Sequence, residues 1–148
     1  MSFAARLLFL ASIFVDASSE HSALAADAAR TVQTHETKTG VRFGCWGDLP
    51  TAPAPTLVVL ASTIDGTLGD AYFRQCGNAL GGKGYLLISI DLPCHGKQHR
   101  ADEPAGLAGW RYRCEQNDDF VKDSNQRLAQ VLDHLITGGH TDAARVAA

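Results

Sequence analysis

Residues 56–61, Thr-Leu-Val-Val-Leu-Ala, and residues 85–90, Tyr-Leu-Leu-Ile-Ser-Ile, decide the fold. Both runs are almost continuously apolar, which is typical of strands buried on both faces of a parallel sheet. After a predicted loop at 64–67, residues 68–80 carry apolar side chains at helical spacing, and the glycines at 81–84 end this predicted helix. Strand, helix and strand in this order predict a right-handed βαβ unit in an α/β fold.

The segments on either side extend this unit. Residues 31–37 and 41–45 alternate and predict an amino-terminal β-hairpin, followed by a proline-rich linker at 49–55. Residues 91–119 predict a long loop with a short helix near 105–110. A capped turn at 141–144 is expected before a further buried strand that begins at 145–148. The clearest helix is predicted over 120–136, capped by Asp118 or Asp119, with one apolar stripe formed by Val121, Leu128, Val131, Leu132, Leu135 and Ile136.

The first 25 residues differ in character from the rest. Arg6, an apolar run at 7–15 and the small residues Ala23-Leu24-Ala25 follow one another in the order of a secretory signal peptide. The apolar run is too short for a stable membrane span, which needs about 20 residues. We expect a signal peptide at 1–25, a folded domain from 26 to 148 and a secreted or periplasmic protein. An amphipathic helix packed on the domain is the alternative.

Composition excludes some classes of function. The net charge is −3 and the basic residues are scattered, so no nucleic-acid surface is expected. The glycines at 81–84 precede a strand, whereas a nucleotide-binding glycine loop follows a strand and opens a helix. No nucleotide or other cofactor is therefore expected.

Four cysteines, at positions 45, 76, 94 and 114, form no Cys-x-x-Cys pair. In an exported protein they allow up to two disulfides, with three pairings left open. Cys94, His95 and His99 lie close in sequence, but no second pair of matching spacing accompanies them, so no metal site is expected.

Residues 91–96, Asp-Leu-Pro-Cys-His-Gly, follow the second buried strand directly. They resemble the Asp-x-Pro-Gly-His-Gly loop of α/β-hydrolases, with Cys94 in place of a glycine. The Gly82-x-Gly84-Tyr85 approach and the later Asp142-x-x-Arg145-Val146 phrase fit the same family. The resemblance covers residues 31–148 and is closest to the branch of dienelactone hydrolases and prolyl-oligopeptidase-like enzymes. It implies that the domain at 26–148 is the amino-terminal part of an α/β-hydrolase fold.

The same resemblance implies a serine nucleophile in a Gly-x-Ser-x-Gly turn, followed in the chain by an acid and a histidine base. The sequence contains no Gly-x-Ser-x-Gly. We therefore expect all three catalytic residues after residue 148, and this chain to be inactive alone. One oxyanion-hole amide is expected in the loop after the first buried strand, with Thr63 as candidate, although Ala61-Ser62 stands where the family usually has His-Gly. A plain strand-to-helix connection is the alternative for this loop.

Residues of the family loop are assigned structural roles. Asp91 is expected to order the loop by accepting hydrogen bonds from backbone N–H groups, with Pro93 and Gly96 shaping the turn. His95 is either a catalytic base or substrate contact, or a histidine that bonds the backbone, and the late position of the family's base favours the latter. A Cys94–His95 dyad is disfavoured because such pairs usually come from distant segments. Three aromatic side chains are expected either to line a substrate cleft or, as is commoner for such rings, to be buried anchors: Trp46, Trp110 and Tyr112.

The parent protein is thus expected to be a serine hydrolase that cleaves a small-molecule ester or a peptide bond through an acyl-enzyme. A non-catalytic binding domain on a trimmed α/β scaffold is the alternative, since a fold does not determine a function.

Overall fold

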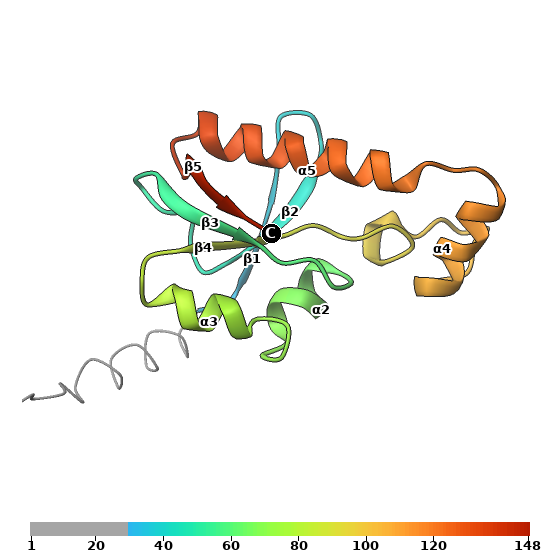
Figure 1. The fold of residues 1–148 in the computed structure, drawn as a ribbon, viewed down its shortest axis with the longest axis horizontal. Helices are drawn as coiled ribbons and strands as arrows, with labels where there is room; N and C mark the ends of the chain where they lie inside the picture. The colour runs from blue at the N-terminus through green and yellow to red at the C-terminus, as the bar shows by residue number, and fades with distance from the viewer. Residues whose placement is uncertain (1–29) are drawn as a thin grey trace, which may run out of the picture.

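The computed structural model describes residues 30–148, and the predicted signal peptide lies outside this part of the chain. Five strands form one mixed sheet in the order β1-β2-β4-β3-β5 (Figure 1). An antiparallel hairpin of β1 (Val32–Glu36) and β2 (Arg42–Trp46) occupies one side and joins β4 antiparallel. Three parallel strands complete the sheet, namely β4 (Leu86–Ser89), β3 (Ala54–Val58) and β5 (Thr141–Ala147). The predicted α/β class, hairpin and βαβ unit are confirmed.

Helices cover both faces of the sheet. One face carries α2 (Ile64–Gly69) and α3 (Gln75–Gly81), and the other carries α5 (Phe120–Thr137) (Figure 1). The short η1 (Gly96–Gln98) and α4 (Gly106–Glu115) lie beyond the carboxyl end of β4. The two helical layers explain why the inner parallel strands β3 and β4 are mostly apolar and buried.

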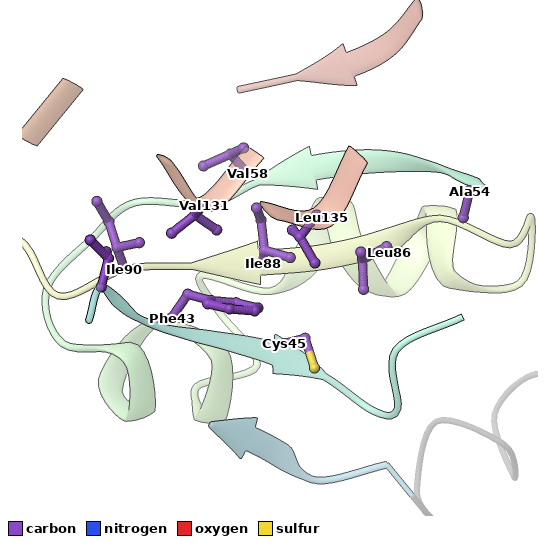
Figure 2. Close-up of a cluster of buried hydrophobic side chains, with 10 residues drawn as sticks. Phe43, Cys45, Ala54, Val58, Leu86, Ile88, Ile90, Val131 and Leu135 are labelled. Atoms are coloured by element: carbon purple, nitrogen blue, oxygen red, sulfur yellow. The ribbon is translucent and has the colours of Figure 1, made fainter. Parts of the chain in front are cut away.

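Side chains of β4 alternate between two cores. Leu86 and Ile88 of β4, and Ile90 just after it, lie in the larger core with Val131 and Leu135 of α5 (Figure 2). Leu87 points to the opposite face and packs with Ile64 and Leu68 of α2. Each of these side chains is at most 4% exposed. Burying an aliphatic side chain of this size stabilises a fold by about 1.5–3 kcal/mol, so β4 anchors both layers.

The predicted loop at 64–67 and single helix over 68–80 are wrong. Thr63 caps α2 by accepting a hydrogen bond from Gly66 N at its Oγ1 (2.9 Å), so the helix begins at Ile64. It ends at Gly69 because Asp70 is extended, and a turn leads to α3. The side chain of Arg74 donates to Leu68 O (2.6 Å) and so satisfies one of the carbonyl groups that lack a partner within the last turn of α2.

The proline-rich linker is shorter than predicted, because β3 begins at Ala54 and includes Pro55. Pro55 cannot donate to a ladder, so a strand accommodates it at an irregularity. The register of β3 with β5 is shifted between Ala54 and Thr56, around Pro55. Beyond the shift, the hydroxyl oxygens of Thr56 and Thr141 lie 2.8 Å apart and tie the two strands together.

The carboxyl-terminal elements need two corrections. The α5 stripe is narrower than predicted, because Val121 is 57% and Ile136 is 37% exposed, although Asp119 caps the helix as expected. The capped turn at 141–144 does not form, since β5 runs from Thr141 to Ala147. Nor is its end buried: residues 143–147 are exposed at the border of the sheet. Pairing with β3 holds this exposed part of the strand, whereas Thr141 at its start is buried.

Candidate functional site

Two loops meet where the parallel strands β3 and β4 end. In open α/β sheets, ligands bind in crevices at the carboxyl ends of strands. The loop after β3 contains Ser62 and Thr63, and the loop after β4 contains residues 91–98. Leu92 N donates to Ser62 O (3.0 Å), which joins the loops directly.

Asp91 makes the second connection between the loops and is only 2% exposed. Its Oδ1 accepts from Ile64 N (2.8 Å), and its Oδ2 accepts from Lys97 N (3.1 Å). The guanidinium of Arg42 on β2 lies 3.3 Å from Oδ2. One buried carboxylate therefore satisfies two backbone N–H groups and a cation from three separate segments.

Two residues of the same loop adopt left-handed backbone conformations. Gly96 has φ +50°, and a Cβ placed there would lie 2.8 Å from the Asp91 carboxylate, so a side chain does not fit. Cys94 has φ +61°, which is uncommon for a residue other than glycine. The Asp-x-Pro-Gly-His-Gly loop that residues 91–96 resemble has a glycine at this position. Glycine adopts this left-handed backbone conformation more easily than any other residue.

A buried ion pair, not anticipated from the sequence, braces the loop from outside. Arg113 of α4 donates to both carboxylate oxygens of Glu103 at 2.7 Å and to Gln98 O at 2.8 Å. The Arg113 hydrogen bonds lower the pKa of Glu103 to about 2, against the opposing effect of burial. No signal in the sequence identifies this pair, since both residues lie among other charged residues in a segment without periodicity. Nor does the sequence identify Arg42 as a partner of Asp91, since its place in the alternating stretch 41–45 predicts a strand and names no partner.

A pocket of about 450 Å³ opens between the two loops and the start of α4, lined by Thr63, Cys94, His95, Gly96, His99, Ala105 and Gly106. The amides of Ser62 and Ile64 are occupied, donating to Thr67 Oγ1 and Asp91 Oδ1. The Thr63 amide makes no hydrogen bond to any residue in the range 30–148. An N–H group without a protein partner beside a pocket can donate to an oxygen of a ligand.

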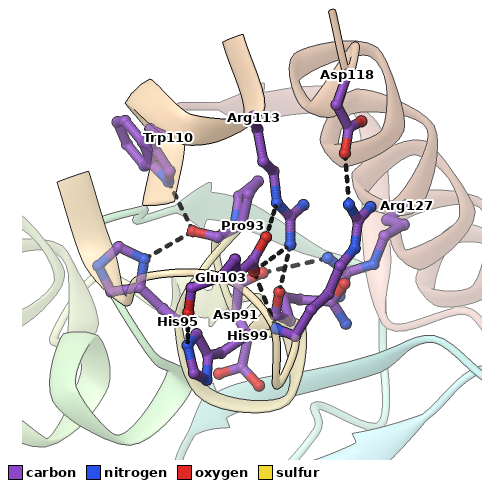
Figure 3. A network of polar contacts seen from close by, with 11 residues as sticks. Asp91, Pro93, His95, His99, Glu103, Trp110, Arg113, Asp118 and Arg127 are labelled. Atoms are coloured by element: carbon purple, nitrogen blue, oxygen red, sulfur yellow. Dashed lines mark hydrogen bonds and ion pairs between the residues drawn. The ribbon is translucent and has the colours of Figure 1, made fainter. Parts of the chain in front are cut away.

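His95 is fixed in orientation beside this pocket. Its Nδ1 lies 2.8 Å from Pro93 O, and the indole Nε1 of Trp110 donates to the same oxygen at 2.6 Å (Figure 3). The rings of His95 and Trp110 meet edge to face with centroids 6.0 Å apart. His95 thus bonds the backbone, while its ring also borders the pocket.

The Cys94 thiol does not pair with His95. Cys94 is fully buried, and burial raises the pKa of its thiol, whereas a nucleophilic cysteine needs a lowered pKa and access. The other histidine of this segment, His99, has its Nε2 2.9 Å from Glu103 O. Within the described part of the chain, no three His, Cys, Asp or Glu side chains are grouped to hold a metal ion.

Cysteines and aromatic side chains fall mostly outside the pocket. All four cysteines are free thiols, with Cys45 and Cys94 buried and Cys76 and Cys114 exposed. None of Trp46, Trp110 and Tyr112 lines the pocket between the loops. Trp46 lines a separate pocket of about 480 Å³ with Gly84 and Leu86, near the amino end of β4, and lies under the Arg74 guanidinium.

Across residues 30–148, no helix has both the length and the apolar character needed to cross a bilayer.

No protein-family model matches the chain, and no curated protein matches its sequence. Among solved structures, the chain is similar to a proposed acetyl xylan esterase from Bacteroides fragilis, with a TM-score of 0.48 and 16% identity. It is also similar to an acetyl xylan esterase from Paenibacillus sp. R4, with a TM-score of 0.46 and 17% identity. These matches cover 87% and 85% of this chain. The chain spans less than half of either structure, 44% and 48% respectively, and at such identities the likeness concerns shape rather than chemistry.

Proposed function

We propose that this chain is the amino-terminal part of a serine hydrolase that cleaves an ester or peptide bond through an acyl-enzyme. The observation that carries the proposal is the Thr63 amide, which lacks a protein partner within residues 30–148 and borders a pocket at the carboxyl ends of two parallel strands. In acyl transfer, an amide in this loop stabilises the negative charge that develops on the substrate's carbonyl oxygen. The Asp-Leu-Pro-Cys-His-Gly loop on the other side of the pocket supports the same class.

Asp91 contributes to this proposal by holding the oxyanion loop in place. Its Oδ1 occupies the N–H of Ile64, the residue after Thr63, at 2.8 Å. The hydrogen bond from Gly66 N to Thr63 Oγ1 holds the side chain of Thr63 itself. A donor fixed before the substrate arrives costs no reorganisation during the reaction, which is the source of its catalytic effect.

The nucleophile, the acid and the base belong, in this proposal, to sequence that follows these 148 residues. Restoring the natural downstream sequence should reveal Gly-x-Ser-x-Gly within about fifteen residues, since the family places it after the next strand. The 148-residue chain should not hydrolyse p-nitrophenyl acetate. A downstream sequence without this motif would refute the proposal. Export by a signal peptide at 1–25 is part of the same proposal.

The Thr63 assignment is tested in the extended enzyme with two variants. Thr63→Pro removes the amide N–H, and its φ of −83° lies near the proline range. Thr63→Ala keeps the N–H and removes only the capping hydroxyl. Loss of one oxyanion donor should lower kcat about 100- to 1000-fold in Thr63→Pro. Equal activity of the two variants would exclude Thr63 as the donor.

A further inference from the structure

The imidazole of His95 has an assigned tautomer. Pro93 O can only accept, so Nδ1, 2.8 Å away, carries the proton and donates. In the neutral ring, Nε2 is then a hydrogen-bond acceptor. Trp110 reinforces this arrangement, because it shares the carbonyl acceptor and packs against the imidazole, while its indole stacks on Phe120 with centroids 6.0 Å apart. The acceptor is therefore held in one direction.

Nε2 is the ring atom on the pocket side. It lies 3.7 Å from the position that a Cβ on Gly106 would occupy, and Gly106 and His95 both line the pocket. No residue in the described range donates to it. In Figure 3 the hydrogen-bonded network with Glu103, Arg113 and Pro93 lies on the other side of the ring.

The rest of the pocket wall offers little competition for a polar ligand. Cys94, Gly96, Ala105 and Gly106 contribute small side chains or none, and the pocket-lining His99 bonds Glu103 O. Among residues 30–148, the pocket thus presents a free donor at the Thr63 amide and a free acceptor at His95 Nε2. This pair matches a small ligand that carries both a carbonyl oxygen and a hydroxyl group.

We propose that His95 is a substrate-binding residue whose Nε2 accepts a hydrogen bond from a hydroxyl group, so that the pocket prefers hydroxyl-bearing esters. This inference rests on the proposed function, because it takes the Thr63 pocket as the place where the ester carbonyl binds. His95 acts by recognition and not as the catalytic base.

The test compares two esters of the same size, methyl glycolate and methyl propionate, which differ by a hydroxyl in place of a methyl group. Each is titrated into the ¹⁵N-labelled 148-residue chain, and the imidazole nitrogens of His95 and the Thr63 amide are followed by NMR. At pH 8 the free chain should show the Nδ1-protonated tautomer of His95. Methyl glycolate should shift Nε2 and bind about three- to tenfold more tightly, the effect of one hydrogen bond.

His95→Phe provides the variant control, since phenylalanine keeps a ring against Trp110 and removes the acceptor. The preference for methyl glycolate should disappear, while the Thr63 amide still responds to both esters. Equal affinity of the wild-type chain for the two esters, or an Nε2-protonated His95, would overturn the inference without reference to any variant. A Thr63 amide that responds to neither ester, beside a responding His95, would instead count against the proposed oxyanion role.

Discussion

Asp91 Oδ1 accepts a hydrogen bond from Ile64 N at 2.8 Å, which joins the loops after β3 and β4 across 27 residues of sequence. The carboxylate is 2% exposed and has a second oxygen engaged by Lys97 N and Arg42. The shape of the pocket therefore depends on one side chain that lies outside its lining.

Replacing Asp91 should destabilise the chain in proportion to the acceptors lost. Asp91→Asn keeps an oxygen for Ile64 N but removes the charge facing Arg42, and we expect a loss of about 1–3 kcal/mol in the free energy of unfolding. Asp91→Ala also leaves Ile64 N unpaired and should cost about 3–5 kcal/mol. Urea unfolding measures both. Exposed Asp102→Asn should change stability by less than about 0.5 kcal/mol, and equal losses in all three variants would contradict this role.

Gly96 should tolerate a side chain less well than a glycine with similar φ in open space. Gly84 has φ +78° and no atom within 4 Å of the point where a Cβ would lie, so Gly84→Ala should cost only the backbone term of about 1 kcal/mol. Gly96→Ala adds the clash with Asp91 and should cost about 2–4 kcal/mol. Thermal unfolding of both variants compares them directly, and equal melting temperatures would show that the loop relaxes freely.

The Glu103–Arg113 pair should make stability depend on acid pH. The pKa of Glu103 is about 2 in the folded chain against 4.5 ordinarily, so the folded state favours the ionised carboxylate. This stabilisation is fully present above about pH 4.5 and is lost as pH falls toward 2, by about 3 kcal/mol. Denaturant unfolding at pH 5 and pH 3 should show the decline, and Glu103→Gln should flatten it. An unchanged slope in the variant would assign the acid sensitivity to other groups.

His35 should produce a protonation effect of the same sign at milder pH. Burial lowers the pKa of its imidazole, and His134 and His140 nearby lower it further, with Asp48 opposing. The unfolded chain therefore binds a proton at His35 more readily than the folded chain, and stability should fall as pH drops below about 6.5. His35→Phe should retain packing on Phe43, whose ring lies 5.4 Å from that of His35. Its melting temperature should fall less between pH 8 and pH 5 than that of the wild-type chain. An equal fall in the two chains would contradict this role of His35.

The four thiols should separate into two reactivity classes. Cys76 and Cys114 are exposed, whereas Cys45 and Cys94 are buried and burial raises the pKa of Cys45 to about 11. Ellman's reagent should modify two thiols in the native chain and all four after unfolding, since only accessible thiolates react. In the double variant Cys76→Ser with Cys114→Ser, no thiol should react quickly. Rapid reaction in that variant would show that a buried cysteine becomes accessible in the native state.

Much of the fold follows from the sequence by itself. The apolar runs at 56–61 and 85–90 and the periodicity of 120–136 determined the parallel strands and α5, because burial on two faces or on one stripe leaves a direct pattern in the residue order. The divided helix at 64–81 left no such pattern. The first helix, α2, begins at the capping hydroxyl of Thr63, and at its end the guanidinium of Arg74 bonds Leu68 O. Both are single polar contacts, which the spacing of apolar residues does not reveal.

The pocket was decided by tertiary structure. The sequence singled out Thr63, Asp91, Pro93, His95 and Gly96 one by one, as members of a loop motif or of a strand-to-helix connection. It contained nothing to say that Arg42 would face Asp91, or that Glu103 and Arg113 would pair beneath Cys94. Arg42 meets Asp91 because β2 pairs antiparallel with β4, and Ile64 meets Asp91 because the parallel strands β3 and β4 end at one edge of the sheet. Glu103 meets Arg113 because α4 lies against the loop that precedes it. These contacts depend on strand pairing and helix packing, which composition does not determine.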